Sequence, residues 1–185
     1  ECGLLVDGFD DPPMAKMPHG RPYYEAHCLR HNLTKETDLL AYRFDIDRAF
    51  LPRAERVLRR AQRDKRITLR SLRPRDVGRH IQPLMDIFND GWSDNWGFDP
   101  VSVDNAEFVA DQMKHVLMDG LIWRADVDGK PAAMMITIPN YNEALVPIRN
   151  GLSPWSVLKS ANMFLRKKFT SARTPLMGVR KEFHG

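Results

Sequence analysis

Cysteine is scarce in this sequence, which contains only Cys2 and Cys28 among its 185 residues. A scaffold held together by disulfides is therefore excluded, because such small folds need several bridges. No basic and apolar signal segment opens the sequence, so we expect reduced thiols and a cytoplasmic protein. The first residue is Glu1 rather than a methionine, which indicates that the sequence is a fragment of a longer protein.

Long hydrophobic runs are absent as well. The longest mostly apolar stretch, Ala132 to Ile138, is far shorter than the roughly 20 residues that a membrane-spanning helix needs. We therefore expect no membrane partner. Hydrophobic residues make up 43% and charged residues 28% of the chain, as in globular proteins, which excludes wholesale disorder. The length suits one ordinary domain with a hydrophobic core.

The basic residues are concentrated in two stretches, although the net charge is only +4. Leu51 to Arg66 has seven basic and two acidic residues (+5), and Gly151 to the end has seven basic and one acidic residue (+6), so the rest carries −7. Basic stretches can bind phosphates or nucleic acid, but a solvated helix face is the commoner meaning. Because no zinc-finger, RNA-binding or helix-turn-helix pattern accompanies the charge, nucleic acid is a less favoured partner.

The first third of the chain predicts a strand, a helix and a second strand. Gly3 to Phe9 is apolar and strand-like, and Pro22 suits the first turn of a helix from Tyr23 to His31. Thr37 to Asp45 is rich in leucine and aromatic residues and is predicted to be the second strand. The arginine-rich stretch 51–66 has apolar residues at helical spacing, which indicates a connecting helix and a domain boundary.

The remaining two thirds predict the order strand, helix, helix, strand, strand, helix, strand. The signals in the first part are an alternating strand at Ile67–Arg70, a helix over Ile81–Trp92 and a capping box at Asp104–Glu107. Two strands then flank Asp128-Gly129, a helix opens at Ser153-Pro154, and a strand covers Pro175–Val179. The apolar face of the helix after Ser153-Pro154 is predicted to consist of Leu158, Ala161, Leu165 and Phe169. Strands on either side of Asp-Gly should pair antiparallel.

This order, together with the run Met177-Gly-Val-Arg-Lys-Glu-Phe-His-Gly185, resembles the first part of a GNAT-type N-acetyltransferase. The resemblance implies an α/β (α+β) fold with a mixed, mostly antiparallel sheet flanked by helices, incomplete at both ends. It also implies that the last strand and the turn after it bind acetyl-coenzyme A, through Met177, Gly178, Val179, Arg180, His184 and Gly185. Free backbone N–H groups and a helix N-terminus favour the anionic pyrophosphate there.

The segment Ile87–Phe98, with the sequence IFNDGWSDNWGF, resembles a tandem GNAT-like bacterial subfamily. The resemblance assigns the amine acceptor to Trp92, Asn95 and Trp96, which would offer a flat apolar wall with polar groups. The alternative interpretation is that Trp92 and Phe98 are core residues and that Asn95 caps the helix end.

The first third also resembles a GNAT-like domain, through its Tyr23–Leu33 helix and the strand that follows. Residues 1–50 are then the C-terminal half of one GNAT-like unit and 51–66 an arginine-rich connector. Residues 67–185 are the N-terminal part of a second unit, truncated at the pyrophosphate loop. That the two halves complete one mixed sheet is a hypothesis from their complementary order.

Acyl transfer to an amine requires a donor for the developing oxyanion and an acid for the departing sulfur. The resemblance implies direct attack by the amine, with a backbone N–H of Gly178 or Val179 as the oxyanion donor. No catalytic side chain can be assigned. Asp90, Asp94 and Glu143 are candidate bases or ammonium anchors, or else surface carboxylates.

No metal is expected. His27, Cys28 and His31 lie within one helical turn, a spacing that metal sites use, but no second pair of ligands accompanies them.

The sequence thus predicts an N-acetyltransferase that moves an acetyl group from acetyl-coenzyme A to an unidentified small-molecule amine. The fragment alone is expected to be inactive. The alternative is a non-catalytic GNAT-like module for binding or assembly, and a nucleic-acid binder that uses the basic connector is a third class. The oligomeric state is left open.

Overall fold

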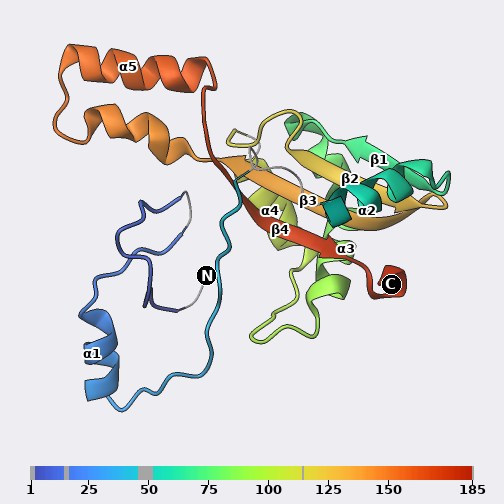
Figure 1. Ribbon diagram of the computed structural model, residues 1–185, viewed down its shortest axis with the longest axis horizontal. Coiled ribbons are helices and arrows are strands. Elements are labelled where there is room, and N and C mark those ends of the chain that lie inside the picture. The colour runs from blue at the N-terminus through green and yellow to red at the C-terminus, as the bar shows by residue number, and fades with distance from the viewer. Residues whose placement is uncertain (1–2, 15–16, 46–51, 114, 185) are drawn as a thin grey trace.

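The computed structural model describes residues 3–14, 17–45, 52–113 and 115–184. Its centre is a four-stranded sheet in the order β1-β2-β3-β4, formed by β1 (Ile67–Ser71), β2 (Ile122–Val127), β3 (Lys130–Pro139) and β4 (Ala172–Val179). Each of the three strand pairs is antiparallel. Helices flank the sheet (Figure 1), so the α+β fold class predicted from the sequence is confirmed.

The β2–β3 hairpin forms where the sequence predicted it. Asp128 and Gly129 both have positive φ, 49° and 78°, as a tight two-residue turn between twisted strands requires. The pairing of Ile122 with Ile136 places both side chains on one face, and alternate residues of β3 from Ala132 to Ile138 are buried on that face. The hairpin therefore sets the register of the core.

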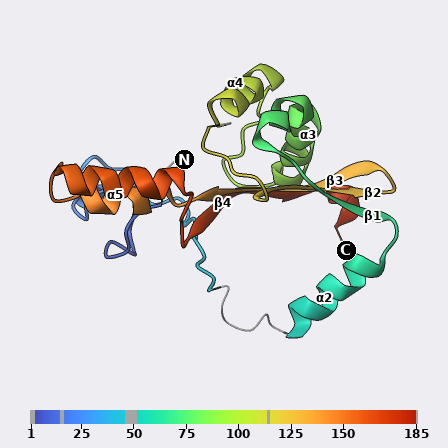
Figure 2. The ribbon, with the colours of Figure 1, turned by 90° about the horizontal axis from the view of Figure 1, so that it is seen from above.

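One face of the sheet is covered by the 3₁₀ helix η1 (Pro74–His80) and the helices α3 (Ile81–Trp92) and α4 (Val103–Met113), as Figure 2 shows. Leu84, Ile87 and Ile122 are fully buried between these layers. Burial of an aliphatic side chain of this size contributes about 1.5–3 kcal/mol, so this layer stabilises the sheet.

The start of α4 differs slightly from the prediction. A capping box was predicted at Asp104–Glu107, but the helix begins at Val103 and Ser102 precedes it. The Ser102 hydroxyl oxygen accepts a hydrogen bond from the Asn105 N–H at 3.4 Å, and the Ser102 carbonyl accepts one from Ala106. Serine competes well with aspartate as an N-cap, which explains the shift.

The opposite face of the sheet is open. Leu69 on β1 and Met177 on β4 are 58% and 60% exposed. The connecting helix α2 (Pro52–Arg63) lies on this side of the sheet in Figure 2, and most of its described side chains are exposed. The predicted helix in the arginine-rich stretch is thus confirmed, although its predicted first residue, Leu51, lies outside the described residues.

A helical hairpin interrupts the path from β3 to β4. It consists of the 3₁₀ helix η2 (Tyr141–Ile148) and α5 (Pro154–Leu165), and it projects beyond the end of the sheet in Figures 1 and 2. The predicted cap is confirmed, because the Ser153 hydroxyl oxygen accepts a hydrogen bond from the Ser156 N–H at 3.1 Å. Of the predicted apolar face, Leu158 and Leu165 are 59% and 83% exposed, whereas Phe169 lies after the end of the helix and is half-buried against Tyr141.

The two strands predicted in the first third are wrong. Residues 3–9 and 37–45 have no strand pairing, and the helix between them, α1 (Tyr24–Arg30), contains no buried residue. Leu40, Tyr42 and Phe44 are 72%, 75% and 83% exposed. β propensity measures how well a side chain fits a packed sheet surface, and these residues have no such surface. The strands of the sheet come from residues 67–179 alone among the described residues.

The end of α1 behaves as helix-ending chemistry predicts. Asn32 has φ 59°, the left-handed conformation that asparagine tolerates, and the Leu33 N–H donates to the Cys28 carbonyl at 3.1 Å.

In the parts of the chain that the structure describes, no helix has the length and apolarity that crossing a bilayer requires.

Candidate functional site

The end of α3 lies directly on the end of β4, and Gly91 makes this contact possible. A Cβ atom at position 91 would lie 2.6 Å from the Val179 carbonyl oxygen and 3.3 Å from the Val179 nitrogen. Any side chain there would displace one backbone from the other. At Gly178 a Cβ would lie 3.6 Å from the Ile87 carbonyl oxygen, an ordinary contact.

The backbone of β4 alternates between two directions at this contact. The Arg180 N–H donates to the Ala132 carbonyl at 2.8 Å, and Gly178 pairs with Met134. In an antiparallel ladder the intervening residues, Met177 and Val179, direct their N–H and C=O groups away from the partner strand. Their carbonyls do accept bonds from outside the ladder, from Trp92 and His184. Of the two predicted oxyanion donors, only the Val179 N–H therefore faces outward.

Trp92 connects the predicted acceptor region to the predicted coenzyme strand. Its indole Nε1–H donates to the Met177 carbonyl at 2.7 Å. The Phe88 ring lies 5.5 Å from the Trp92 ring and 5.7 Å from the Phe98 ring, centroid to centroid. Trp92 is half-buried, so it both packs against neighbouring rings and contacts β4.

Asn95 and Trp96 lie in the turns that follow α3. The Asn95 N–H bonds to the Trp92 carbonyl and the Phe98 N–H to the Asn95 carbonyl, at 2.9 and 3.1 Å. The Asn95 side chain is exposed and Trp96 is 59% exposed. The structure therefore brings Trp92 against β4 and leaves Trp96 facing solvent.

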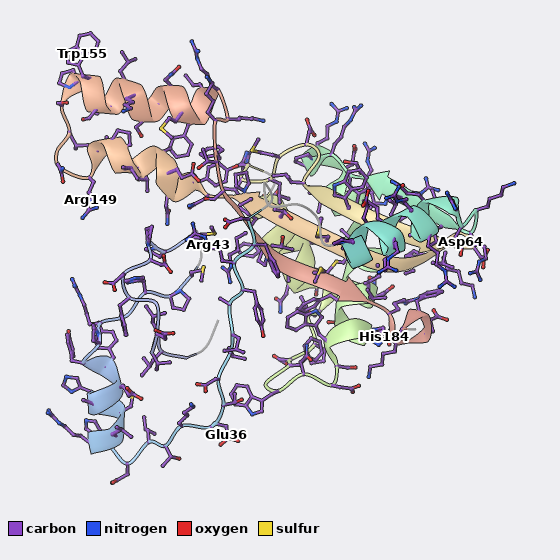
Figure 3. All side chains as sticks on the ribbon, viewed as in Figure 1. Glu36, Arg43, Asp64, Arg149, Trp155 and His184 are labelled. Carbon is purple, nitrogen blue, oxygen red and sulfur yellow. The ribbon has the colours of Figure 1, made fainter. Side chains whose placement is uncertain are left out.

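The chain turns sharply after β4 and is fastened to α3. The 3₁₀ helix η3 (Lys181–Phe183) follows Arg180, and His184 comes next with extended backbone. The Lys181 N–H donates to the Asp90 carboxylate at 2.8 Å, and the Lys181 ammonium lies 2.7 Å from Asp94. His184 Nε2 lies 3.0 Å from the Val179 carbonyl oxygen, at the end of β4 in Figure 3. Gly185, the last predicted coenzyme residue, lies outside the described residues.

These contacts give the candidate carboxylates particular partners. Asp90 and Asp94 hold Lys181, so they position the turn after β4. Glu143 lies elsewhere, at the base of the helical hairpin, where it accepts the N–H and hydroxyl groups of Thr170 and Ser171. Burial raises the pKa of Glu143, but these hydrogen bonds outweigh it and leave the pKa below 4.5. Such a carboxylate is a poor proton acceptor near neutral pH.

A second polar cluster lies at the other edge of the sheet, and the sequence analysis did not find it. Asp126 is 1% exposed, and its carboxylate lies 2.8 Å from both the Arg70 and the Arg124 guanidinium. Burial raises the pKa of Asp126, and the two arginines lower it by more, so the net shift is downward. A hollow of about 420 Å³ opens beside the cluster, lined by Arg70, Ser71, Leu72, Arg73, Asp76, His80 and Arg124.

No group of three or more histidine, cysteine, aspartate or glutamate side chains gathers in the described ranges as a metal site would. Cys28 is a free thiol, and Cys2 lies outside those ranges.

Gly91 is the residue of the α3–β4 contact that sequence reasoning missed. The available signal was a single glycine inside an otherwise apolar helical pattern, since such a glycine costs helix stability and usually marks a close approach. Asp90 and Lys181 were too far apart in sequence for any spacing rule to pair them.

No family model matches the chain. Two curated proteins are similar to it over almost its whole length. Protein YghO of Escherichia coli strain K12 is 36% identical over 184 residues, which cover 99% of this chain and 47% of that protein. The bacterial ceramide synthase of Caulobacter vibrioides is 36% identical over 183 residues, again 99% of this chain and 47% of the relative. The chain thus spans about half the length of the curated relatives it matches.

Proposed function

We propose that the protein of which this chain is a part transfers an acyl group from a coenzyme A thioester to an amine, with acetyl as the group expected from the GNAT resemblance. The observation that supports this most directly is the outward-facing backbone of β4 at Met177 and Val179, held against the end of α3 by Gly91 and Trp92. Because the carbonyls of Met177 and Val179 already accept from Trp92 and His184, an extended amide-containing arm such as pantetheine would pair with the outward N–H groups of this edge.

The groups around the end of β4 fit a nucleotide thioester. Two basic residues follow the strand: Arg180, which is half-buried, and Lys181, which is exposed. Lys181 shares its ammonium with Asp94, so a phosphate would compete with that carboxylate for the same cation. In this proposal the region after β4 receives the anionic part of the coenzyme and the strand receives its amide arm.

The reaction is balanced as a direct transfer. The amine nitrogen attacks the thioester carbonyl carbon, a C–N bond forms, the C–S bond breaks, and the coenzyme leaves as a thiol with the proton that the amine gives up. The Val179 N–H is the proposed donor to the carbonyl oxygen as negative charge develops there. Trp92 is a positioning residue, because it holds Met177, two residues earlier on the same strand.

The similarity to a ceramide synthase fits the same class of reaction. A ceramide is an amide of a fatty acid and a long-chain amino alcohol, so the name of that relative describes acyl transfer to an amine. This is a specific reason to test fatty acyl donors and long-chain amines beside acetyl-coenzyme A and small amines. The thioester donor is a cytoplasmic metabolite, so the expected cytoplasmic location belongs to this proposal.

The test is thiol release from acetyl- and fatty acyl-coenzyme A by the full-length protein, with a panel of small and long-chain amines. Val179→Pro removes the outward N–H and leaves the ladder bonds of Gly178 and Arg180 in place, since proline is tolerated at such strand edges. We expect kcat to fall about 100-fold or more, as when an oxyanion donor is removed.

Val179→Ala is the matched control, because it trims the side chain and keeps the N–H. It should retain turnover within a few fold. Coenzyme binding without thiol release for any amine would favour a non-catalytic module. Absence of both binding and release would overturn the proposal.

A further inference from the structure

The contacts that fasten the hairpin of η2 and α5 lie at its base, as far as the described residues show. There Tyr141 stacks on Phe164 with ring centroids 5.8 Å apart, and Phe169 meets Tyr141 edge-on at 4.9 Å. Glu143 fastens Thr170 and Ser171 at the same end. Figures 1 and 2 show the rest of the hairpin extending away from α3, α4 and the sheet. Its far end is therefore free to meet another surface.

The polarity of α5 is the reverse of an ordinary surface helix. Ser160 faces inward: it is 7% exposed, and its hydroxyl donates to the Ala144 carbonyl at 2.6 Å. Trp155, Leu158 and Leu165 face outward, with 80%, 59% and 83% of their surface exposed. Their spacing of three and seven residues places them on one side of the helix. This apolar stripe of Trp155, Leu158 and Leu165 thus faces outward, while Ser160 and Phe164 face η2.

The far end of the hairpin extends this stripe. Val146 and Leu152, on either side of the turn between η2 and α5, are 64% and 77% exposed. Figure 3 shows Trp155 and Arg149 at this end, farthest from the sheet. The apolar side chains therefore lie on a convex projection rather than in a groove, a shape that suits insertion into a soft surface.

Beyond Glu143 at its base, the hairpin carries charge of a single sign. From Ala144 to Ser171 the chain has no acidic residue, and its basic residues are Arg149, Lys159, Arg166, Lys167 and Lys168. Another exposed apolar stretch, 39–44, lacks this bias: it is flanked by Lys35 and Asp38, which pair with each other, and it contains Arg43, which lies near Asp11. Exposed apolar side chains and an excess of basic residues thus occur together from residue 144 to 171 but not in the stretch 39–44.

We propose that this hairpin lies on the surface of a bilayer that contains anionic lipids. Trp155, Leu158 and Leu165 would insert at the boundary between headgroups and acyl chains, and Lys159 and Arg166, which flank the stripe, would meet the lipid phosphates. Tryptophan is favoured at that boundary, and basic residues there gain from the negative surface potential. The expectation of no membrane partner was argued from the lack of a spanning helix, and this proposal departs from it. A helix that lies in the headgroup region need not be long enough to cross the bilayer, so this binding requires no spanning segment.

A lipid surface accounts for both features at once. Uniform basic charge complements a uniformly anionic surface, whereas the α2 helix, which is also basic, exposes fewer apolar side chains and pairs Arg59 with Glu55. The inference does not depend on the proposed acyl transfer, because it rests on residues remote from β4 and Gly91.

The experiment measures binding of the full-length protein to two kinds of vesicle, phosphatidylcholine with phosphatidylglycerol and phosphatidylcholine alone. We expect binding to the anionic vesicles that weakens with salt, and a blue shift of tryptophan fluorescence. Trp155→Ala and Leu165→Ser should each lower partitioning several-fold, and the combined variant Lys159→Gln, Arg166→Gln, Lys168→Gln about tenfold or more. Trp155→Phe should keep binding and lose most of the blue shift.

The matched control neutralises three basic residues beside β1, with Arg60→Gln, Arg63→Gln and Lys65→Gln combined. It should bind within about twofold of the unchanged protein. All substituted positions are exposed, so thermal unfolding should be the same in every variant. No binding to anionic vesicles would overturn the inference, as would binding that only the control variant loses. Shielding of Trp155 from acrylamide without lipid would indicate a protein surface as its partner instead, and would also overturn it.

Discussion

At Gly91 the backbone of α3 lies so close to the backbone of β4 that there is no room between them for a Cβ atom. In Gly91→Ala the new methyl group would lie 2.6 Å from the Val179 carbonyl oxygen, a contact with backbone that cannot rotate away. We expect a loss of about 1–3 kcal/mol in the free energy of unfolding, as for overpacked sites. Acyl transfer should fall as well, because β4 must shift. Thermal unfolding and thiol release measure the two effects.

Gly78→Ala is the control for this prediction. Gly78 lies in η1, its φ is not positive, and a Cβ there would meet nothing within 4 Å. Alanine should be neutral or slightly stabilising at such a position. Equal destabilisation by both substitutions would mean that the close approach of α3 to β4 is not what Gly91 provides.

Single residues show where sequence reasoning reached the site and where it stopped. Trp92 was predicted, and it does contact β4. Gly178 and Val179 could not be separated by sequence, because the direction of each N–H depends on which residues pair in the ladder. Asp126 was missed because Arg70, one of its two arginine partners, lies 56 residues away on the neighbouring strand.

Among the elements, the helical hairpin depends on one carboxylate at its base. Glu143 accepts bonds from Thr170 and Ser171, which lie after α5. Its pKa is lowered from 4.5, so its contribution to stability is present above that value and is lost as the pH falls through the lowered pKa. We expect Glu143→Gln to lower the free energy of unfolding at pH 7 by about 1–2 kcal/mol. The difference from the unchanged protein should shrink in acid, which thermal unfolding at both pH values measures.

A difference that stayed constant from neutral to acid pH would contradict this account, since it would show that the ionised form of Glu143 is not what holds the two ends of the helical hairpin together. Glu182→Gln is a suitable control. Glu182 is exposed and lies 3.7 Å from Arg180, an ion pair of the kind that contributes little.

The elements that sequence predicted well are those with local signals. These signals depend only on residues close together in the sequence: Asp128-Gly129, Ser153-Pro154 and the three- and four-residue spacing in α3. The structure contains the elements that they predict, namely the β2–β3 hairpin, α5 and α3. The strands predicted at 3–9 and 37–45 were wrong because a strand also needs a neighbour. The periodicity of the sequence identified the apolar side of α5. It could not show that this side faces solvent, because that depends on how Ser160 packs against η2.

In the whole molecule the hydrophobic core belongs to one part of the chain. The buried apolar cluster runs from Leu72 to Ile138, with Tyr141 and Leu176 packed against it. Among the described residues, the segment before α2 contributes none of these side chains, and a hydrogen bond from the Asn142 side chain to the Pro13 carbonyl joins it to the rest. The boundary that the sequence placed in the arginine-rich stretch remains a prediction, and this distribution makes it testable.

Trypsin should cleave α2 first, because this helix is rich in arginine and its described side chains are mostly exposed. Since the core lies after the cut, we expect the part that begins near Ile67 to keep its cooperative unfolding, with a midpoint within a few degrees of the uncut protein, on the order of 1 kcal/mol or less. Calorimetry before and after cleavage measures this, and a sizing column shows whether the two parts separate. Loss of the cooperative transition on cleavage would mean that the first third stabilises the sheet, and the boundary would then have to be moved.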